Sequence, residues 1–143
     1  MRKRWNGTIL FVACLVLWAF AARFLTGCSV KKEHQDKVRD LEFTVAGEAE
    51  LPEELKNLVD EKKTEPFRLT YSNDQGLYIA VGYGEQPTGG YSIAVSELYL
   101  TENSIVIDTE LLGPEQGETA GIEKSWPYLV VKTEYLENPV IFQ

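Results

Sequence analysis

The sequence predicts a mainly β (α+β) fold, a small antiparallel β-sandwich or open barrel of about six strands with one N-terminal amphipathic helix packed on it. Three observations lead to this prediction. From Phe67 onward, short segments alternate between apolar and polar residues and are separated by turn residues. Before them, residues 52–63 have apolar residues at helical spacing. The chain has 143 residues, which leaves enough for one modest core after residues 1–27 are set aside.

The helix over residues 52–63 is predicted from its ends and from one apolar stripe. Pro52 suits the first turn of a helix and Lys62 the last turn, and Pro66 prevents the helix from continuing. We expect the stripe to cover one face of a sheet, and a partner-binding helix is the alternative. The stripe consists of Leu51, Leu55, Leu58 and Val59.

Six segments have the alternation that is typical of strands, and a short apolar tail follows them. The period slips by one residue before Leu98, which predicts a bulge near Ser96-Glu97. Small residues such as Ala80 on one face of the third segment leave room for the helix or a second sheet. The tail, Pro139–Phe142, is expected to dock as a short edge strand. The six segments are Leu41–Ala46, Phe67–Tyr71, Leu77–Tyr83, Tyr91–Leu100, Ile105–Leu111 and Tyr128–Thr133.

In the connection over residues 83–91, proline and glycine residues specify the shape of the loop more than charged residues specify its charge. Pro87 fixes its own φ, and Gly89 and Gly90 permit positive φ. Aromatic residues flank this connection and the start of the later strand, where they could anchor a binding surface or border the β core. The candidate partner-binding residues are Tyr83, Pro87, Thr88, Gly89, Gly90, Tyr91, Trp126, Pro127 and Tyr128.

Residues 84–93, together with Trp126-Pro127-Tyr128, resemble the C-terminal domain of the protease complex subunit PrcB family. That family's pattern pairs a threonine-glycine-glycine-tyrosine loop with a later aromatic-proline-tyrosine strand start. The resemblance covers roughly residues 67–133. It implies an exported, often lipid-anchored accessory protein of surface proteases, with an exported protease or its complex as the partner. It implies no defined reaction.

The beginning of the chain has the features of an export signal. A basic start, Met1–Arg4, precedes the uncharged run Ile9–Ala22. As a helix this run would span about 21 Å, which is short of the ~30 Å hydrocarbon core. Leu25–Cys28 has the form of a lipobox, which predicts lipidation of Cys28. We therefore divide the chain into a signal peptide or membrane leader (1–27), a charged tether (28–40) and a PrcB-like β domain (41–143).

Arg23 departs from the lipobox pattern, since lipoprotein signals normally carry no charge so close to the cysteine. Two alternatives follow. Ala19–Ala21 resembles a site for ordinary secretory cleavage, or the segment stays uncleaved as a signal anchor with Arg23 at the outer interface. All three place the domain outside the cytoplasmic membrane, and the lipoprotein interpretation places it on the extracytoplasmic face of the bacterial cytoplasmic membrane.

Composition argues against several classes of function. The chain has 22 acidic and 14 basic residues, and four of the basic ones precede residue 28, so the remainder is strongly acidic and nucleic acid is a poor partner. The one histidine, His34, lies in the tether, and a Ser-His-Asp or Cys-His site in the domain is therefore not expected. Cys14 and Cys28 do not form a disulfide framework. We expect no metal, no cofactor and no enzyme activity.

Three hypotheses remain, and the first is a non-enzymatic accessory protein of an extracellular protease complex. The second is a protease inhibitor, because Pro87–Tyr91 also resembles a loop of the chagasin-type cysteine protease inhibitors. In that case Thr88–Tyr91 and Ser125–Trp126 would lie side by side at one end of the sheet. The order Trp126-Pro127 differs from the arginine-proline-aromatic order of that family. The third is a binding module for cell-wall or small-molecule ligands.

Overall fold

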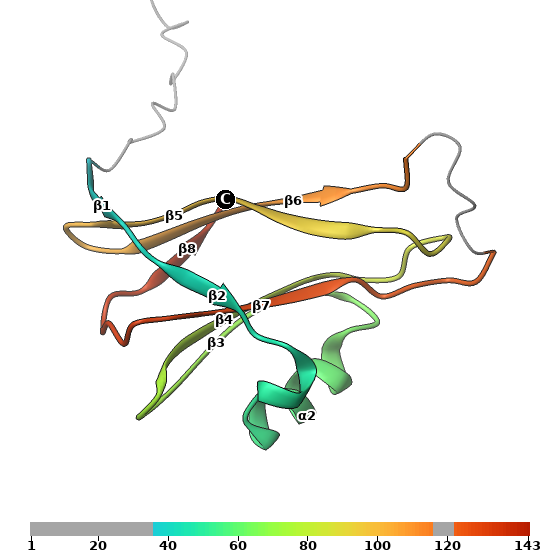
Figure 1. The fold of residues 1–143 in the computed structure, drawn as a ribbon, viewed down its shortest axis with the longest axis horizontal. Coiled ribbons are helices and arrows are strands. Elements are labelled where there is room, and N and C mark those ends of the chain that lie inside the picture. The colour runs from blue at the N-terminus through green and yellow to red at the C-terminus, as the bar shows by residue number, and fades with distance from the viewer. Residues whose placement is uncertain (1–35, 116–121) are drawn as a thin grey trace, which may run out of the picture. The chain divides into compact units, whose positions relative to one another are not determined.

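The computed structural model describes residues 36–115 and 122–143, which form two four-stranded sheets and one α-helix (Figure 1). The mainly β prediction is confirmed, and the two separate sheets correspond to the sandwich alternative. The helix is α2 (Glu53–Lys62), preceded by the 3-10 turn η1 (Glu48–Glu50). The strands are β1 (Lys37–Asp40), β2 (Phe43–Val45), β3 (Pro66–Asn73), β4 (Gly76–Tyr83), β5 (Ser92–Thr101), β6 (Ile105–Leu112), β7 (Tyr128–Thr133) and β8 (Val140–Phe142).

The first sheet has the order β1-β5-β6-β8 and the second the order β2-β7-β4-β3. All neighbouring strands are antiparallel except β6 and β8, which run parallel. The tail forms the predicted short edge strand, and its parallel direction differs from the antiparallel pairing expected for the sandwich. The reason is geometric: Ile105 pairs with Val140, so β8 begins beside the first residue of β6 and runs along it. The register of β5 shifts between Val95 and Glu97, which confirms the predicted bulge.

The space between the two sheets is filled by the apolar residues that alternation predicts for one face of each strand. Leu77, Ile79 and Val131 of the second sheet form one cluster with Leu98, Ile105 and Ile107 of the first. Ile79, Ile105 and Val131 are completely buried. This cluster holds the two layers together, since burial of such side chains stabilises a fold by about 1.5–3 kcal/mol each.

Helix α2 packs on the other face of the second sheet, as predicted. Leu55 and Val59 are buried against Tyr78, Ala80 and Val130. The small Ala80 leaves the room that the helix occupies. One residue of the predicted stripe differs: Leu58 is 39% exposed, because the sheet contacts a narrower strip of the helix than the four apolar positions define.

The N-terminal boundary of the β domain differs from the prediction. Residues 37–40, expected in the tether, form β1, and only Phe43–Val45 of the predicted strand 41–46 is a strand. All of β1 is exposed because it is an edge strand held to β5 through its backbone. Phe43 and Val45 are also exposed, since β2 is the edge of its sheet. An edge strand needs few apolar residues, so composition alone does not distinguish β1 from a tether.

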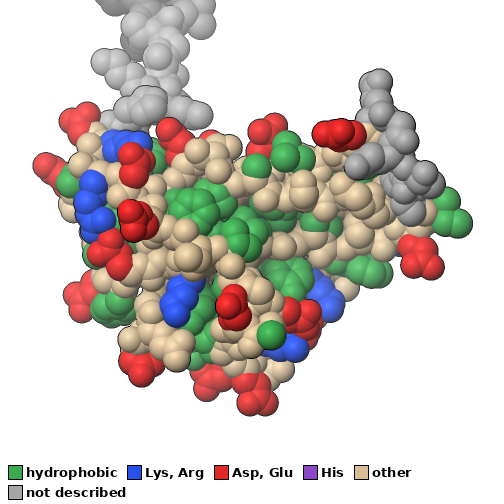
Figure 2. Space-filling view, in the orientation of Figure 1, with side chains coloured by type: hydrophobic (Ala, Val, Ile, Leu, Met, Phe, Trp, Pro, Cys, Tyr) green, Lys and Arg blue, Asp and Glu red, His purple; other side chains and the backbone are tan. Residues whose placement is uncertain are grey.

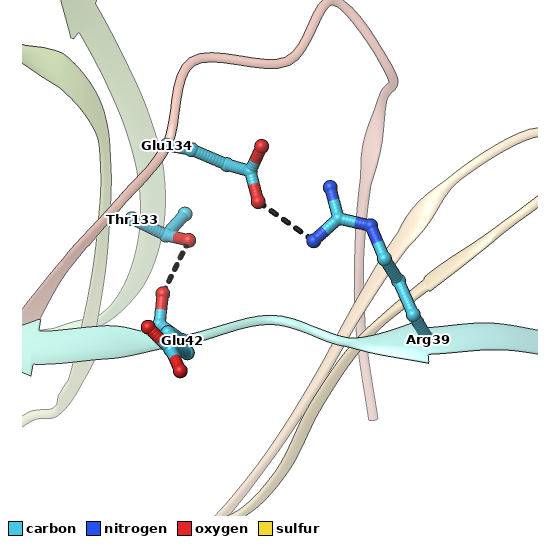
Figure 3. A network of polar contacts seen from close by, with 4 residues as sticks. All are labelled: Arg39, Glu42, Thr133 and Glu134. Carbon is cyan, nitrogen blue, oxygen red and sulfur yellow. Dashed lines mark hydrogen bonds and ion pairs between the residues drawn. The ribbon is translucent and has the colours of Figure 1, made fainter.

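Between β1 and β2 the chain crosses from one sheet to the other, and polar contacts fix this crossing (Figure 3). The Thr133 hydroxyl donates to the Glu42 carbonyl over 2.8 Å. The Arg39 guanidinium donates to the Glu134 carboxylate over 2.7 Å, and this hydrogen bond lowers the pKa of Glu134. Leu41, between these contacts, is buried in the core. The crossing is therefore tied to the end of β7.

The predicted leader, the lipidation site Cys28, and residues 116–121 lie outside the described residues. Within residues 36–115 and 122–143, no helix is long and apolar enough to cross a membrane. The first part of the tether, residues 28–35, lies outside the described residues as well.

Candidate functional site

Two connections that lie far apart in the sequence meet at one end of the sandwich, at the right of Figure 1. They are residues 84–91, between β4 and β5, and residues 124–127, before β7; we call them together the loop end. Gln86 and Ser125 form an antiparallel bridge. The Gln86 amide donates to the Ser125 carbonyl over 2.7 Å, and the Ser125 amide donates back over 3.1 Å. The loop end is thus a small extension of the second sheet.

Side chains add three further links within the loop end. The Ser125 hydroxyl donates to the Thr88 carbonyl over 2.6 Å. The Gln86 amide group donates to the Tyr83 carbonyl over 3.1 Å. Lys124 pairs with Glu85 over 2.6 Å between Nζ and Oε1. The loops are therefore fixed relative to each other by backbone bonds, a hydroxyl and an ion pair.

Two glycines are required by the shape of the first loop. Gly84 has φ of +70°, and a Cβ there would lie 2.8 Å from Pro66 Cδ and 2.9 Å from Pro66 N. Gly90 has φ of +82°, and a Cβ there would lie 3.0 Å from Pro114 Cβ. Gly89 does not have positive φ, so of the predicted pair only Gly90 uses this freedom. The positive φ of Gly84 was not predicted from the sequence.

Tyr83 points between the two sheets. Its hydroxyl lies 2.7 Å from the Thr109 carbonyl, to which it donates, and 3.0 Å from the Thr109 hydroxyl. Its backbone amide donates to the Pro127 carbonyl over 3.1 Å. Tyr83 thereby joins β4 to β6 and supports the second loop, so the structure gives it a positioning role.

The Tyr83→Phe variant is expected to lose about 1 kcal/mol of unfolding free energy, because it removes one hydroxyl that serves a partly buried carbonyl. Urea denaturation of the variant beside wild type measures this. Tyr135→Phe is the matched control, since Tyr135 is 55% exposed and should change stability by less than about 0.5 kcal/mol. Equal stability of the two variants would contradict the role of the Tyr83 hydroxyl.

Tyr91 and Tyr128 are both half-buried. Tyr91 lies beside Gly113, where a Cβ would be 3.7 Å from Tyr91 Cε1. Tyr128 packs against the cluster under α2. Burial, and then the nearby carboxylates Glu48 and Asp60, raise the pKa of Tyr128. Tyr128 therefore belongs to the border of the core on the helix side.

Trp126 is the large side chain that the loop end presents to solvent, with 40% of its surface exposed. Pro87 is exposed in the first loop, while Thr88 and Pro127 are half-buried. Glu85 and Lys124 are exposed and were not among the predicted site residues. Nothing in the sequence signalled their pairing, since 39 positions separate them.

The described residues contain no group of three or more His, Cys, Asp or Glu side chains that could hold a metal ion. A shallow hollow of about 720 Å³ lies at the crossing between β1 and β2, lined by residues that include Phe43, Gln75 and Thr133. A second hollow, of about 360 Å³, lies beside Pro66, Arg68 and Tyr83. The loop end thus exposes one large aromatic side chain, Trp126, on two connections that the Gln86–Ser125 bridge joins.

Comparison with known proteins identifies a family that part of the chain resembles. Residues 77–134 match the family described as PrcB C-terminal. The chain carries a PrcB-like domain over residues 77–134. The matched segment contains both connections of the loop end and strands β4 to β7, with only Gly76 of β4 outside it. Neither the curated proteins nor the solved structures gave a match to the chain.

The residues that match the PrcB C-terminal family form the central strands of both sheets. Strands β4 and β7 are neighbours in the second sheet, and β5 and β6 are neighbours in the first. The matched segment thus contributes two paired strands to each layer, and the two loops that meet at their end. Outside the match lie α2 and the four edge strands, β1, β2, β3 and β8.

Proposed function

We propose that this protein is a non-enzymatic accessory subunit of an extracytoplasmic protease complex, and that its loop end contacts the partner protein. The match to the PrcB C-terminal family supports the association with a protease complex, since resemblance to that family implies a protease complex subunit. The observation that supports the loop end as the contact site is the exposed Trp126 side chain, which lies on loops joined by the Gln86–Ser125 bridge. A rigid aromatic anchor loses little conformational entropy on binding, which favours its use at an interface.

The proposal includes attachment to the outer face of the cytoplasmic membrane through a lipid on Cys28. The lipobox-like Leu25–Cys28 after a short apolar run supports it. Secretion after cleavage near Ala21, and a signal anchor, are the alternatives. Mass spectrometry of the mature N-terminus distinguishes the three, because only a lipoprotein would begin at a diacylglycerol-modified Cys28.

A pull-down from native membranes with the tagged full chain tests the function. We expect wild type to capture an exported protease, and Trp126→Ala to reduce the captured amount by about tenfold or more, as for a hot-spot residue that contributes about 1.4 kcal/mol or more. Tyr135→Ala is the matched control, because it also removes an exposed aromatic ring but lies beyond the other end of β7. Equal capture by the two variants would contradict the assignment of the loop end.

A chagasin-like inhibitor is the second candidate function, and one observation favours it. The Ser125 hydroxyl bonds the Thr88 carbonyl, so the two loops lie side by side as that hypothesis requires. Such loops would enter the substrate cleft of a protease. Adding the purified chain to a panel of cysteine proteases tests it, and an absence of inhibition at micromolar concentration would remove it.

A further inference from the structure

The edge strands of the sandwich cover only the half that lies away from the loop end. Strand β1 pairs with β5 only at residues 99–101, and β2 pairs with β7 only at residues 131–133. Within the described residues, Ser92–Ser96 of β5 therefore has β6 on one side and no strand on the other. This stretch directly follows the first connection of the loop end.

The backbone groups that face this free edge can be assigned from the ladder. In antiparallel pairs, residues that exchange hydrogen bonds alternate with residues that do not. The Ile107 carbonyl accepts from the Gln143 amide on the β8 side of β6, so Thr109, two residues further along β6, also directs its backbone groups away from β5. Thr109 and its partner Val95 therefore form a pair without mutual bonds. The Val95 amide and carbonyl then point away from β6. By the same alternation, those of Ile93 do so too.

Other edges of the sandwich carry features that prevent strand addition. Strand β3 begins with Pro66 and directs Arg68 toward the other sheet, where it lies 5.8 Å over the Phe142 ring. Strand β1 has a register shift and carries Lys37 and Arg39. Strands β2 and β8 have three residues each.

The uncovered part of β6 is protected as well, by Asp108, Glu110 and the Tyr83 hydroxyl on the Thr109 carbonyl. Ser92–Ser96 differs from all of these edges. Its sequence, Ser-Ile-Ala-Val-Ser, contains neither a charge nor a proline. An edge without such protection is a template for pairing with another chain.

An apolar surface lies next to this free edge. Val95 and Leu129 pack on the core between the sheets and stay partly exposed, and Ile93 is also half-buried. Figure 2 shows hydrophobic side chains gathered on this face of the molecule, between the two sheets. A strand added to β5 would place every second side chain over this surface.

The other face of the first sheet is acidic next to the free edge. Glu97 and Asp108 lie directly opposite each other, and Glu110 lies on the same face of β6. Among the described residues, none of these three carboxylates forms an ion pair. The charge of Glu97 contributes to the raised pKa of Lys37, but the ammonium group of Lys37 is paired with Asp40. Like charges on opposed strands are unfavourable, and cations beside them would relieve this.

We propose that Ser92–Ser96 binds an extended basic segment of a partner protein as an additional strand of the first sheet. The apolar residues of the segment would cover Ile93, Val95 and Leu129, and its basic residues would lie near Glu97, Asp108 and Glu110. A second copy of this acidic chain would instead bring two sets of carboxylates together. This inference rests on the proposed function only in that the partner is a protein.

Hydrogen exchange of the full chain, followed by NMR, tests the proposal with a synthetic peptide of alternating valine and lysine. We expect the amides of Ile93 and Val95 to exchange rapidly in the free chain and to become protected when the peptide binds. The same peptide with methyl groups on the backbone nitrogens that face β5 should bind at least about tenfold more weakly. Glu97→Lys should weaken the binding of the unmodified peptide, while Glu53→Lys on α2 should leave this binding unchanged.

Three results would overturn the proposal. One is no protection of Ile93 and Val95 with the peptide at about 1 mM, the upper range of weak binding. Another is equal binding of the methylated and unmodified peptides. The third is protection of these amides that grows with protein concentration in the absence of peptide, which would indicate that a second copy of the chain binds at this edge. Because the peptide is synthetic, this result is independent of whether a protease is captured from membranes, so either hypothesis can fail alone.

Discussion

The Leu55→Ala variant is expected to lose about 3 kcal/mol of unfolding free energy, the largest effect of a single truncation on α2. Leu55 is fully buried beneath the helix, where it packs with Val59, Tyr78 and Val130. Truncation removes the transfer free energy of its side chain and leaves a cavity between the helix and the second sheet. The cavity cannot collapse easily, because β4, which carries Tyr78 and Ala80 below it, is paired on both sides.

Urea denaturation of Leu55→Ala beside Leu58→Ala measures this effect. The two variants lose the same atoms from the same helix, but Leu58 is 39% exposed and should cost less than about 1 kcal/mol. Similar losses in both variants would contradict the packing of α2 on the sheet as described, since helix propensity favours alanine over leucine at both positions.

The Gly84→Ala variant is expected to lose about 3 kcal/mol, for two additive reasons. A non-glycine residue at φ of +70° costs about 1–2 kcal/mol. The new Cβ would also meet Pro66 Cδ at 2.8 Å and Pro66 N at 2.9 Å, and such overpacking costs about 1–3 kcal/mol. Pro66 cannot move away freely, since it pairs with Tyr83 at the start of β3.

Gly113→Ala is the matched control for Gly84→Ala. A Cβ at Gly113 meets Tyr91 Cε1 at an ordinary 3.7 Å, so the change should stay within about 0.5 kcal/mol. Both variants are compared by urea denaturation. A neutral Gly84→Ala would mean that the first loop is not held in the conformation described, and the fixed geometry of the loop end would then lose its basis.

Local patterns were sufficient to predict most elements of this fold. The helix followed from an apolar stripe bounded by Pro52 and Lys62, and the observed α2 spans Glu53–Lys62. The bulge in β5 followed from a slip in alternation, because a side chain that changes face requires an extra residue in the ladder. Such features depend on neighbours in the sequence, and these are visible without coordinates.

The features that the sequence did not predict depend on residues far apart in the chain. Arg39 and Glu134 are separated by 95 positions, and Tyr83 and Thr109 by 26. The edge strand β1 lacks an apolar pattern because its pairing uses the backbone. The two loops were predicted to lie side by side only under the inhibitor hypothesis. In the structure the Gln86–Ser125 bridge joins them, and this contact could not be read from the sequence motif.

The central claim is that the loop end of this PrcB-like domain contacts a partner protein, and cross-linking tests it most directly. A photo-reactive amino acid is placed at position 126 of the full chain, and in a second variant at position 135, followed by illumination of native membranes. We predict an adduct with a component of an exported protease complex from position 126 and none from position 135. Adducts from position 135 alone would contradict the claim and would place the interface at the opposite end of the sandwich.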